Sequence, residues 1–143
     1  MKIITRILTA GLVALALVGC AAGPKFSEVS SKIPAVPADS GRVYVYRTAI
    51  VGAAVQPDVK IDGKVVGKAV PQGFFYVDLP AGNHEIVTST EVDRKLSLTL
   101  DKGQTRYVRL DIGLGFFVGH IYPKLVDPAV GAKEIQECSV ASK

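Results

Sequence analysis

Few residues in this chain of 143 have side chains and a spacing that suit catalysis or metal binding. The two histidines, His84 and His120, have no cysteines or acids at the spacing of a metal centre, and Glu85 points away from its strand neighbour His84. The chain has no nucleophile elbow, phosphate-binding loop or CxxC pair. The aspartates after residue 40 show no calcium-loop spacing and are scattered over positions Asp58, Asp62, Asp78, Asp93, Asp101, Asp111 and Asp127. We therefore expect no catalytic residue, metal or cofactor, and leave open a carboxylate pair that the fold brings together.

The clearest chemistry belongs to the thiol of Cys20. Lys2 and Arg6 precede an apolar run over residues 7–18, which is shorter than the roughly 20 residues that cross a bilayer and is typical of a secretory signal peptide. Residues 17–20, Leu-Val-Gly-Cys, resemble the bacterial lipobox. The resemblance implies cleavage between Gly19 and Cys20, diacylglycerol on the Cys20 sulfur, and an acyl chain on the new amino group. The alternatives are a plain cleaved signal peptide and an uncleaved anchor.

Lipidation of Cys20 would leave the other cysteine, Cys138, unpaired in an oxidising compartment. We expect Cys138 to be a small, partly buried residue, with an intermolecular disulfide as the alternative. Cleavage would also remove two basic residues, so the formal net charge falls from +4 to about +2. The sequence contains no run of Lys and Arg, and we expect no nucleic-acid partner.

The chain after the cysteine divides into a tether and a β-domain. Residues 20–40 contain Gly and Pro breaks and are expected to form a lipidated tether. Within it, Phe26, Val29 and Ile33 are spaced as on one side of a short helix, with Ser27 as its cap. This segment therefore forms either a short helix on the domain or a plain disordered tether.

From residue 41 the apolar residues recur with a period of two, which is typical of strands. Asp62-Gly63 predicts a tight hairpin turn, because glycine accepts the positive φ of a type I′ turn. We predict an all-β fold over 41–143, a single antiparallel β-sandwich or barrel, with a short C-terminal helix within 128–138. The eight expected strands lie in residues 42–47, 59–61, 65–66, 75–79, 84–90, 96–100, 107–112 and 116–126.

Two stretches resemble known families. Gly-Arg-Val-Tyr-Val-Tyr-Arg at 41–47, preceded by Gly-Pro-Lys-Phe-Ser at 23–27, resembles bacterial lipoproteins of domain-of-unknown-function family 2846. The strand–turn–strand pattern of residues 59–67, followed by 79–86, is similar to the PEGA-type β-domain. Both resemblances imply an all-β module of the cell envelope, and neither brings a catalytic residue.

A candidate contact surface comprises Phe116, Phe117, Tyr44 and Tyr46. The two phenylalanines lie in the glycine-rich stretch 113–119, which we expect to be a buried strand with glycine bulges. The alternative is an exposed loop that contacts lipid or a protein. The two tyrosines, where they face outward from a strand, could stack on sugars or peptides.

These features predict a lipid-anchored, non-catalytic binding or structural module. Ala21 stands where an aspartate is associated with retention in the inner membrane. The resemblance therefore implies the outer membrane, with the domain facing the periplasm, rather than the inner membrane or the cell surface. The expected partners are the membrane, through the lipid on Cys20, and an envelope protein or glycan. The alternative functions are an inhibitor or immunity-type protein against a periplasmic enzyme and a hydrolase acting on the cell wall.

Overall fold

The computed structural model describes residues 20–141, and the predicted signal segment 1–19, including Gly19, lies outside this range. Within the described residues the helices and strands follow in the order α1 (Phe26–Val29), η1 (Ser30–Lys32), β1 (Ser40–Tyr46), β2 (Asp58–Ile61), β3 (Lys64–Lys68), β4 (Gly73–Pro80), β5 (Gly82–Ser89), β6 (Asp93–Leu100), β7 (Thr105–Gly113), β8 (His120–Val126), α2 (Pro128–Glu134), η2 (Ile135–Glu137) and β9 (Ser139–Val140). The all-β fold and the short C-terminal helix are thus confirmed.

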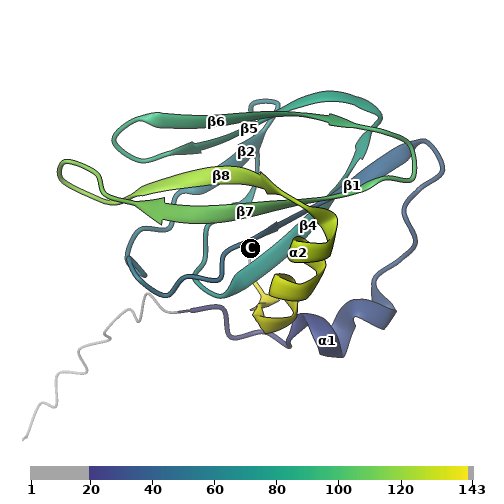
Figure 1. Ribbon diagram of the computed structural model, residues 1–143, viewed down its shortest axis with the longest axis horizontal. Coiled ribbons are helices and arrows are strands. Elements are labelled where there is room, and N and C mark those ends of the chain that lie inside the picture. The colour runs from purple at the N-terminus through teal and green to yellow at the C-terminus, as the bar shows by residue number, and fades with distance from the viewer. Residues whose placement is uncertain (1–19, 142–143) are drawn as a thin grey trace, which may run out of the picture.

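The strands form two sheets that lie face to face as a sandwich (Figure 1). One sheet has the order β8-β7-β1-β4-β9 and the other the order β3-β2-β5-β6. The pairing is antiparallel as predicted except at two places, where β1 runs parallel to β7 and β4 runs parallel to β9. The predicted hairpin turn joins β2 to β3, with positive φ angles of 51° at Asp62 and 80° at Gly63.

Strand β1 is buried on both faces, which the period of two did not indicate. Val43 and Val45 point into the core between the two sheets. Tyr44 and Tyr46 point to the other face, where they are covered by α1, η2 and neighbouring side chains and are only 7% and 1% exposed. The prediction that these tyrosines belong to an outward contact surface is therefore wrong, because the helical segments cover the outer face of their sheet.

The segment predicted as a tether packs on the domain from its start. The short helix is confirmed as α1 and η1, although it begins after Lys25 rather than at Ser27. Phe26 is buried, and its ring lies 5.1 Å from that of Phe74 in an edge-to-face arrangement. The amide of Phe26 also donates to the carbonyl of Cys138 at 2.9 Å. The chain from residue 21 onward is thus held against the sandwich rather than hanging as a loose coil.

The C-terminal segment completes a second apolar cluster on the outer face of the larger sheet, which comprises Phe26, Tyr44, Tyr46, Phe74, Ile135 and Cys138. Asp127 caps α2 by accepting a hydrogen bond from the amide of Ala129 at 2.8 Å, and Pro128 occupies the first turn. The thiol of Cys138, beyond η2, is free and fully buried. Burial raises the pKa of this thiol to about 11, so Cys138 is a packing residue, as expected, and is inaccessible to an intermolecular disulfide.

Candidate functional site

Cys20 and four loops lie together at one end of the sandwich, which we call the Cys20 end. The loops comprise residues 47–57, 69–72, 90–92 and 114–119. Because β1 and β7 are parallel, the loops that follow them emerge on the same side, and the β5–β6 hairpin tip reaches the loop after β7. Figure 1 shows these loops at the left.

Cys20 is exposed, and the next residue is hydrogen-bonded to the domain. The amide of Ala21 donates to the carbonyl of Pro71 at 2.9 Å, in the loop before β4. An acyl group on the Cys20 sulfur would therefore be attached directly at the surface of the sandwich, without an intervening free segment.

The loop 114–119 is exposed, and the prediction that it forms a buried strand is wrong. Phe116 and Phe117 are 87% and 85% exposed, and their rings contact each other edge to face at 4.7 Å. Strand β8 begins only at His120. The backbone folds back so closely that a side chain at Gly115 would collide with the carbonyl of Val118. The exposure of this loop agrees with the alternative interpretation, and its contact with lipid or a protein stays a prediction.

The carboxylate of Glu91 holds this loop in shape. It accepts hydrogen bonds from the amides of Phe116 at 3.0 Å, Val118 at 2.9 Å, and Phe117 between them. Burial alone would raise the pKa of Glu91, but these three bonds outweigh it and the pKa is lowered. His120 Nε2 lies 3.4 Å from the same carboxylate. Glu91 and Phe117 are 26 residues apart, and nothing in the local sequence pattern reveals the contact.

Arg47 organises the other loops of the Cys20 end from inside. Its side chain is fully buried, and its guanidinium donates to the carbonyls of Val55 at 2.7 Å, Ala69 at 2.8 Å, Val51 at 2.9 Å and Gly52 at 3.0 Å. Burial lowers its pKa. Arg47 was not predicted as a functional residue, although the alternation in β1 continues through position 47 and points its side chain into the core between the sheets.

The two histidines do not meet. His84, at the opposite end, has Nδ1 2.6 Å from an oxygen of Asp62 and Nε2 2.8 Å from the carbonyl of Pro80. Burial lowers the pKa of His84, but these two contacts outweigh it and the pKa is raised. His120, beside Thr90 and Glu91, belongs to the Cys20 end. Among residues 20–141 no group of three or more His, Cys, Asp or Glu is placed to hold a metal ion.

A partly buried polar network ties α2 to the larger sheet. The hydroxyl of Tyr46 donates to Glu134 at 2.6 Å, and Arg109 binds both Glu134 at 2.9 Å and Asp111 at 2.6 Å. Burial, followed by the neighbouring Glu134 carboxylate, raises the pKa of Tyr46. These groups satisfy one another's hydrogen bonds, so the network positions the helix.

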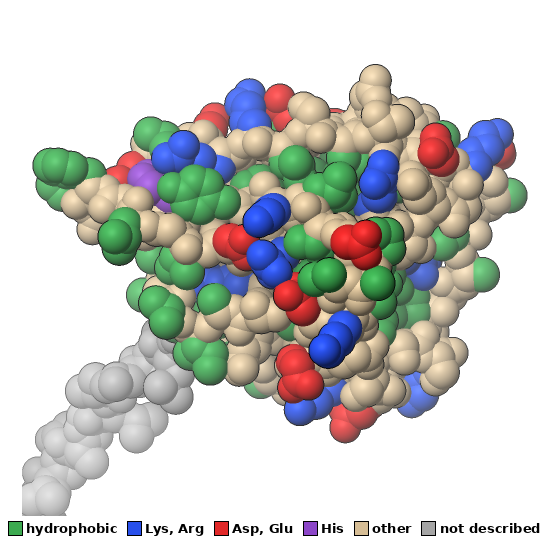
Figure 2. All heavy atoms as spheres, viewed as in Figure 1, with side chains coloured by type: hydrophobic (Ala, Val, Ile, Leu, Met, Phe, Trp, Pro, Cys, Tyr) green, Lys and Arg blue, Asp and Glu red, His purple; other side chains and the backbone are tan. Residues whose placement is uncertain are grey.

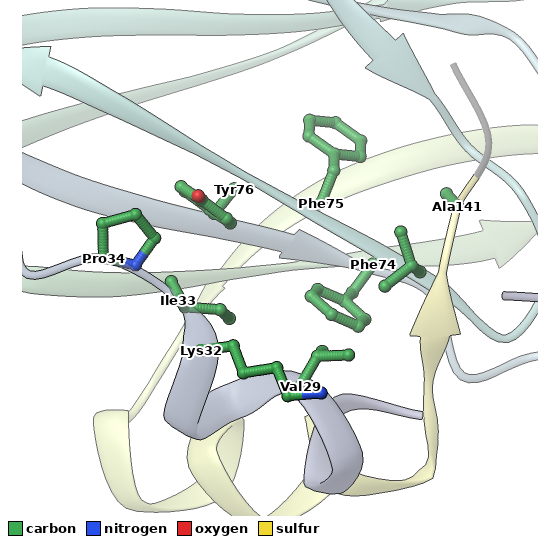
Figure 3. A pocket seen from close by; sticks show the side chains of 9 residues that line it. Val29, Lys32, Ile33, Pro34, Phe74, Phe75, Tyr76 and Ala141 are labelled. Carbon is green, nitrogen blue, oxygen red and sulfur yellow. The ribbon is translucent and has the colours of Figure 1, made fainter. Parts of the chain in front are cut away.

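An apolar groove of about 490 Å³ lies between the helical segment α1–η1 and strand β4 (Figure 3). Lys32 is the one charged residue among the nine that line it. The full lining is Val29, Lys32, Ile33, Pro34, Phe74, Phe75, Tyr76, Val140 and Ala141. The groove has the size and polarity of an apolar ligand site but lacks converging acid and base groups among these residues.

The helices of residues 20–141 are all too short or too polar to cross a bilayer.

The family model described as a protein of unknown function, DUF2846, matches residues 37–121, which is more than half of the chain. A protein of Haemophilus influenzae named only as uncharacterized is 30% identical over 134 residues, covering 90% of this chain and 80% of that protein. The chain therefore belongs to the DUF2846 family, whose function is not known.

Proposed function

We propose that this chain is a bacterial lipoprotein whose sandwich serves as a non-catalytic binding or structural module at the outer membrane, facing the periplasm. The observation that carries the proposal is the position of Cys20. It follows Leu-Val-Gly in the sequence, and its side chain is exposed immediately before Ala21, whose amide is hydrogen-bonded to the loop at Pro71. Two or three acyl chains hold a protein on a bilayer far better than one.

The arrangement of the titratable groups supports a role without catalysis. His84 and His120 lie at opposite ends of the sandwich, and each is engaged with one carboxylate. Tyr46, Arg109 and Glu134 are committed to holding α2. Anchoring such a module raises its effective concentration for any other component of the same surface.

The anchor is tested in cells with an alkyne analogue of palmitate. Cys20→Ser should abolish incorporation of the label and leave a larger, uncleaved precursor, because the acylated sulfur is required before cleavage. Cys138→Ala is the matched control, since its thiol is buried and should not be acylated. In wild type the label should sit in the outer-membrane fraction of a density gradient. Unchanged labelling and processing of Cys20→Ser would contradict the proposal.

The non-catalytic role is tested on purified cell wall and in intact cells. The protein should release no soluble glycan or peptide fragments from isolated wall, and crosslinking should capture a reproducible envelope component. Fragments released in proportion to the amount of protein would instead identify a hydrolase.

A further inference from the structure

Exposed apolar side chains concentrate at the Cys20 end. Nine large hydrophobic residues are exposed among residues 20–141, and seven of them lie in the loops of this end. The remaining two, Val65 and Val130, lie on β3 and α2. The seven are Ile50, Val51, Val92, Leu114, Phe116, Phe117 and Val118. Figure 2 shows hydrophobic side chains projecting at the left tip of the molecule.

The same loops expose almost no charge. Residues 48–57, 69–72 and 113–119 contain no Lys, Arg, Asp or Glu. The two charged residues within these loops are hydrogen-bonded to the backbone. Arg47 is buried and donates to carbonyls, and the carboxylate of Glu91 accepts hydrogen bonds from the amides of residues 116–118. Four charged residues border the end: Asp58 pairs with Lys68 at 3.7 Å, Asp93 accepts a hydrogen bond from Ser89, and Arg94 lies over the ring of Tyr122. The loops of this end therefore present mainly apolar side chains, and the backbone amides of residues 116–118 are already hydrogen-bonded.

We propose that the Cys20 end enters the surface of a phospholipid bilayer, with Leu114, Phe116 and Phe117 at the boundary between headgroups and acyl chains. The inference rests on the proposed lipidation of Cys20. Because Ala21 is bonded to the loop at Pro71, acyl chains on Cys20 would hold this end, rather than another face, against the lipid. Apolar groups of this kind settle about 5–10 Å into the interface.

The geometry of the loop suits this environment. An unpaired amide in hydrocarbon is costly, and the Glu91 carboxylate already satisfies the amides of residues 116–118. A protein partner would also cover apolar side chains, but the anchor brings the bilayer to this end whether or not such a partner exists.

The chain contains no tryptophan, so a single indole reports its own surroundings. Phe117→Trp places that indole at the Cys20 end, and Lys102→Trp places it in the turn at the far end, where the lysine side chain is 66% exposed. Both variants, purified as lipidated protein from membranes, are reconstituted into phosphatidylethanolamine–phosphatidylglycerol vesicles with and without brominated acyl chains.

We expect the indole at position 117 to emit at shorter wavelength than the indole at position 102 in the same vesicles. Its fluorescence intensity should fall by more than half when brominated lipid replaces unbrominated lipid. The indole at position 102 should not be quenched. An unquenched, water-like emission at position 117, in protein that floats with the vesicles, would overturn the insertion while leaving the anchor intact, and would favour a protein partner at this end. Protein that carries no acyl chains and does not float would overturn the anchor and, with it, the insertion.

Discussion

The two ends of the sandwich differ in chemistry although the same strands build both. At the far end, the tight turns at 62–63 and 101–103 carry charged residues that pair across elements, as His84 does with Asp62 and Lys102 with Asp39 at 2.8 Å. Charged side chains are visible at the right of Figure 2. At the Cys20 end two loops, 47–57 and 114–119, are longer and carry exposed apolar residues, and Arg47 and Glu91 hydrogen-bond to their backbone. Hairpins can close with polar turns, as the far end shows, so strand connection alone does not require the apolar loops.

The comparison predicts that Arg47 is the most sensitive polar side chain of the Cys20 end. Arg47→Met should lower the free energy of unfolding by about 3–5 kcal/mol, because several carbonyls lose their donor and each unpaired buried group costs about 1–3 kcal/mol. Chemical denaturation measures the loss. Lys102→Met at the far end is the control and should change stability by less than about 1 kcal/mol, as surface ion pairs do. Equal effects of the two variants would show that the guanidinium does not organise its end.

Two glycines with positive φ give a matched test of backbone space at the two ends. Gly63, in the far-end turn, has φ of 80° and no atom near an added Cβ, so Gly63→Ala should cost about 1 kcal/mol through backbone strain alone. Gly52 has φ of 69°, and its added Cβ would collide with the end of the Ile112 side chain. Gly52→Ala should therefore cost about 2–3 kcal/mol, combining the strain with overpacking. Thermal unfolding of both variants decides whether the loop 47–57 is packed as tightly as the structure shows.

Most of the strands could be predicted from the sequence, whereas their long-range arrangement could not. Alternation and turn residues located the eight main strands, because both signals are local. The parallel pairing of β1 with β7 joins residues far apart, such as Tyr46 and Arg109, and no local pattern encodes it. Alternation also showed that Tyr44 and Tyr46 share a face, but not that helical segments cover that face.

The Cys20 end, too, could be predicted only in part from the sequence. The sequence placed the apolar stretch around Phe116 and Phe117 but predicted a buried strand, because apolar composition alone does not distinguish a core strand from an exposed loop. The exposure arises from the glycine-permitted reversal at Gly115 and from the remote carboxylate of Glu91. Cys20 was found from its neighbours in the sequence, whereas its position beside the apolar loops depends on the fold.

The far end should show a pH-dependent contribution from His84 and Asp62. The pKa of His84 is raised above its ordinary 6.5, so its contribution is full below that value and is lost as the pH rises through the folded pKa. The hydrogen bond from His84 lowers the pKa of Asp62 below its ordinary 3.8, so its contribution is full above that value and is lost as the pH falls through the folded pKa.

The pair should therefore stabilise the protein most between about pH 4 and pH 6.5. Because Asp62 is 47% exposed, the effect should be a fraction of a kcal/mol. The melting temperature of wild type minus that of His84→Gln, measured from pH 3 to pH 9, should peak in that window. A difference that grows above pH 7 would have the wrong sign for this pair.

The smallest expected change in stability comes from the most prominent side chain of the Cys20 end. Phe117→Asp should alter the free energy of unfolding by less than about 0.5 kcal/mol, because the ring is 85% exposed and loses little packing. Phe74→Ala is the contrasting control: this ring is 2% exposed beneath α1, and its loss should cost about 3–5 kcal/mol. A large fall in stability for Phe117→Asp would place the ring in the core and remove the difference between the two ends. The lipid contact of the same variant is measured with a tryptophan at position 116, in the double variant Phe116→Trp, Phe117→Asp. Unchanged stability, together with loss of quenching of this indole by brominated lipid, would show that the apolar tip serves contact with lipid rather than folding.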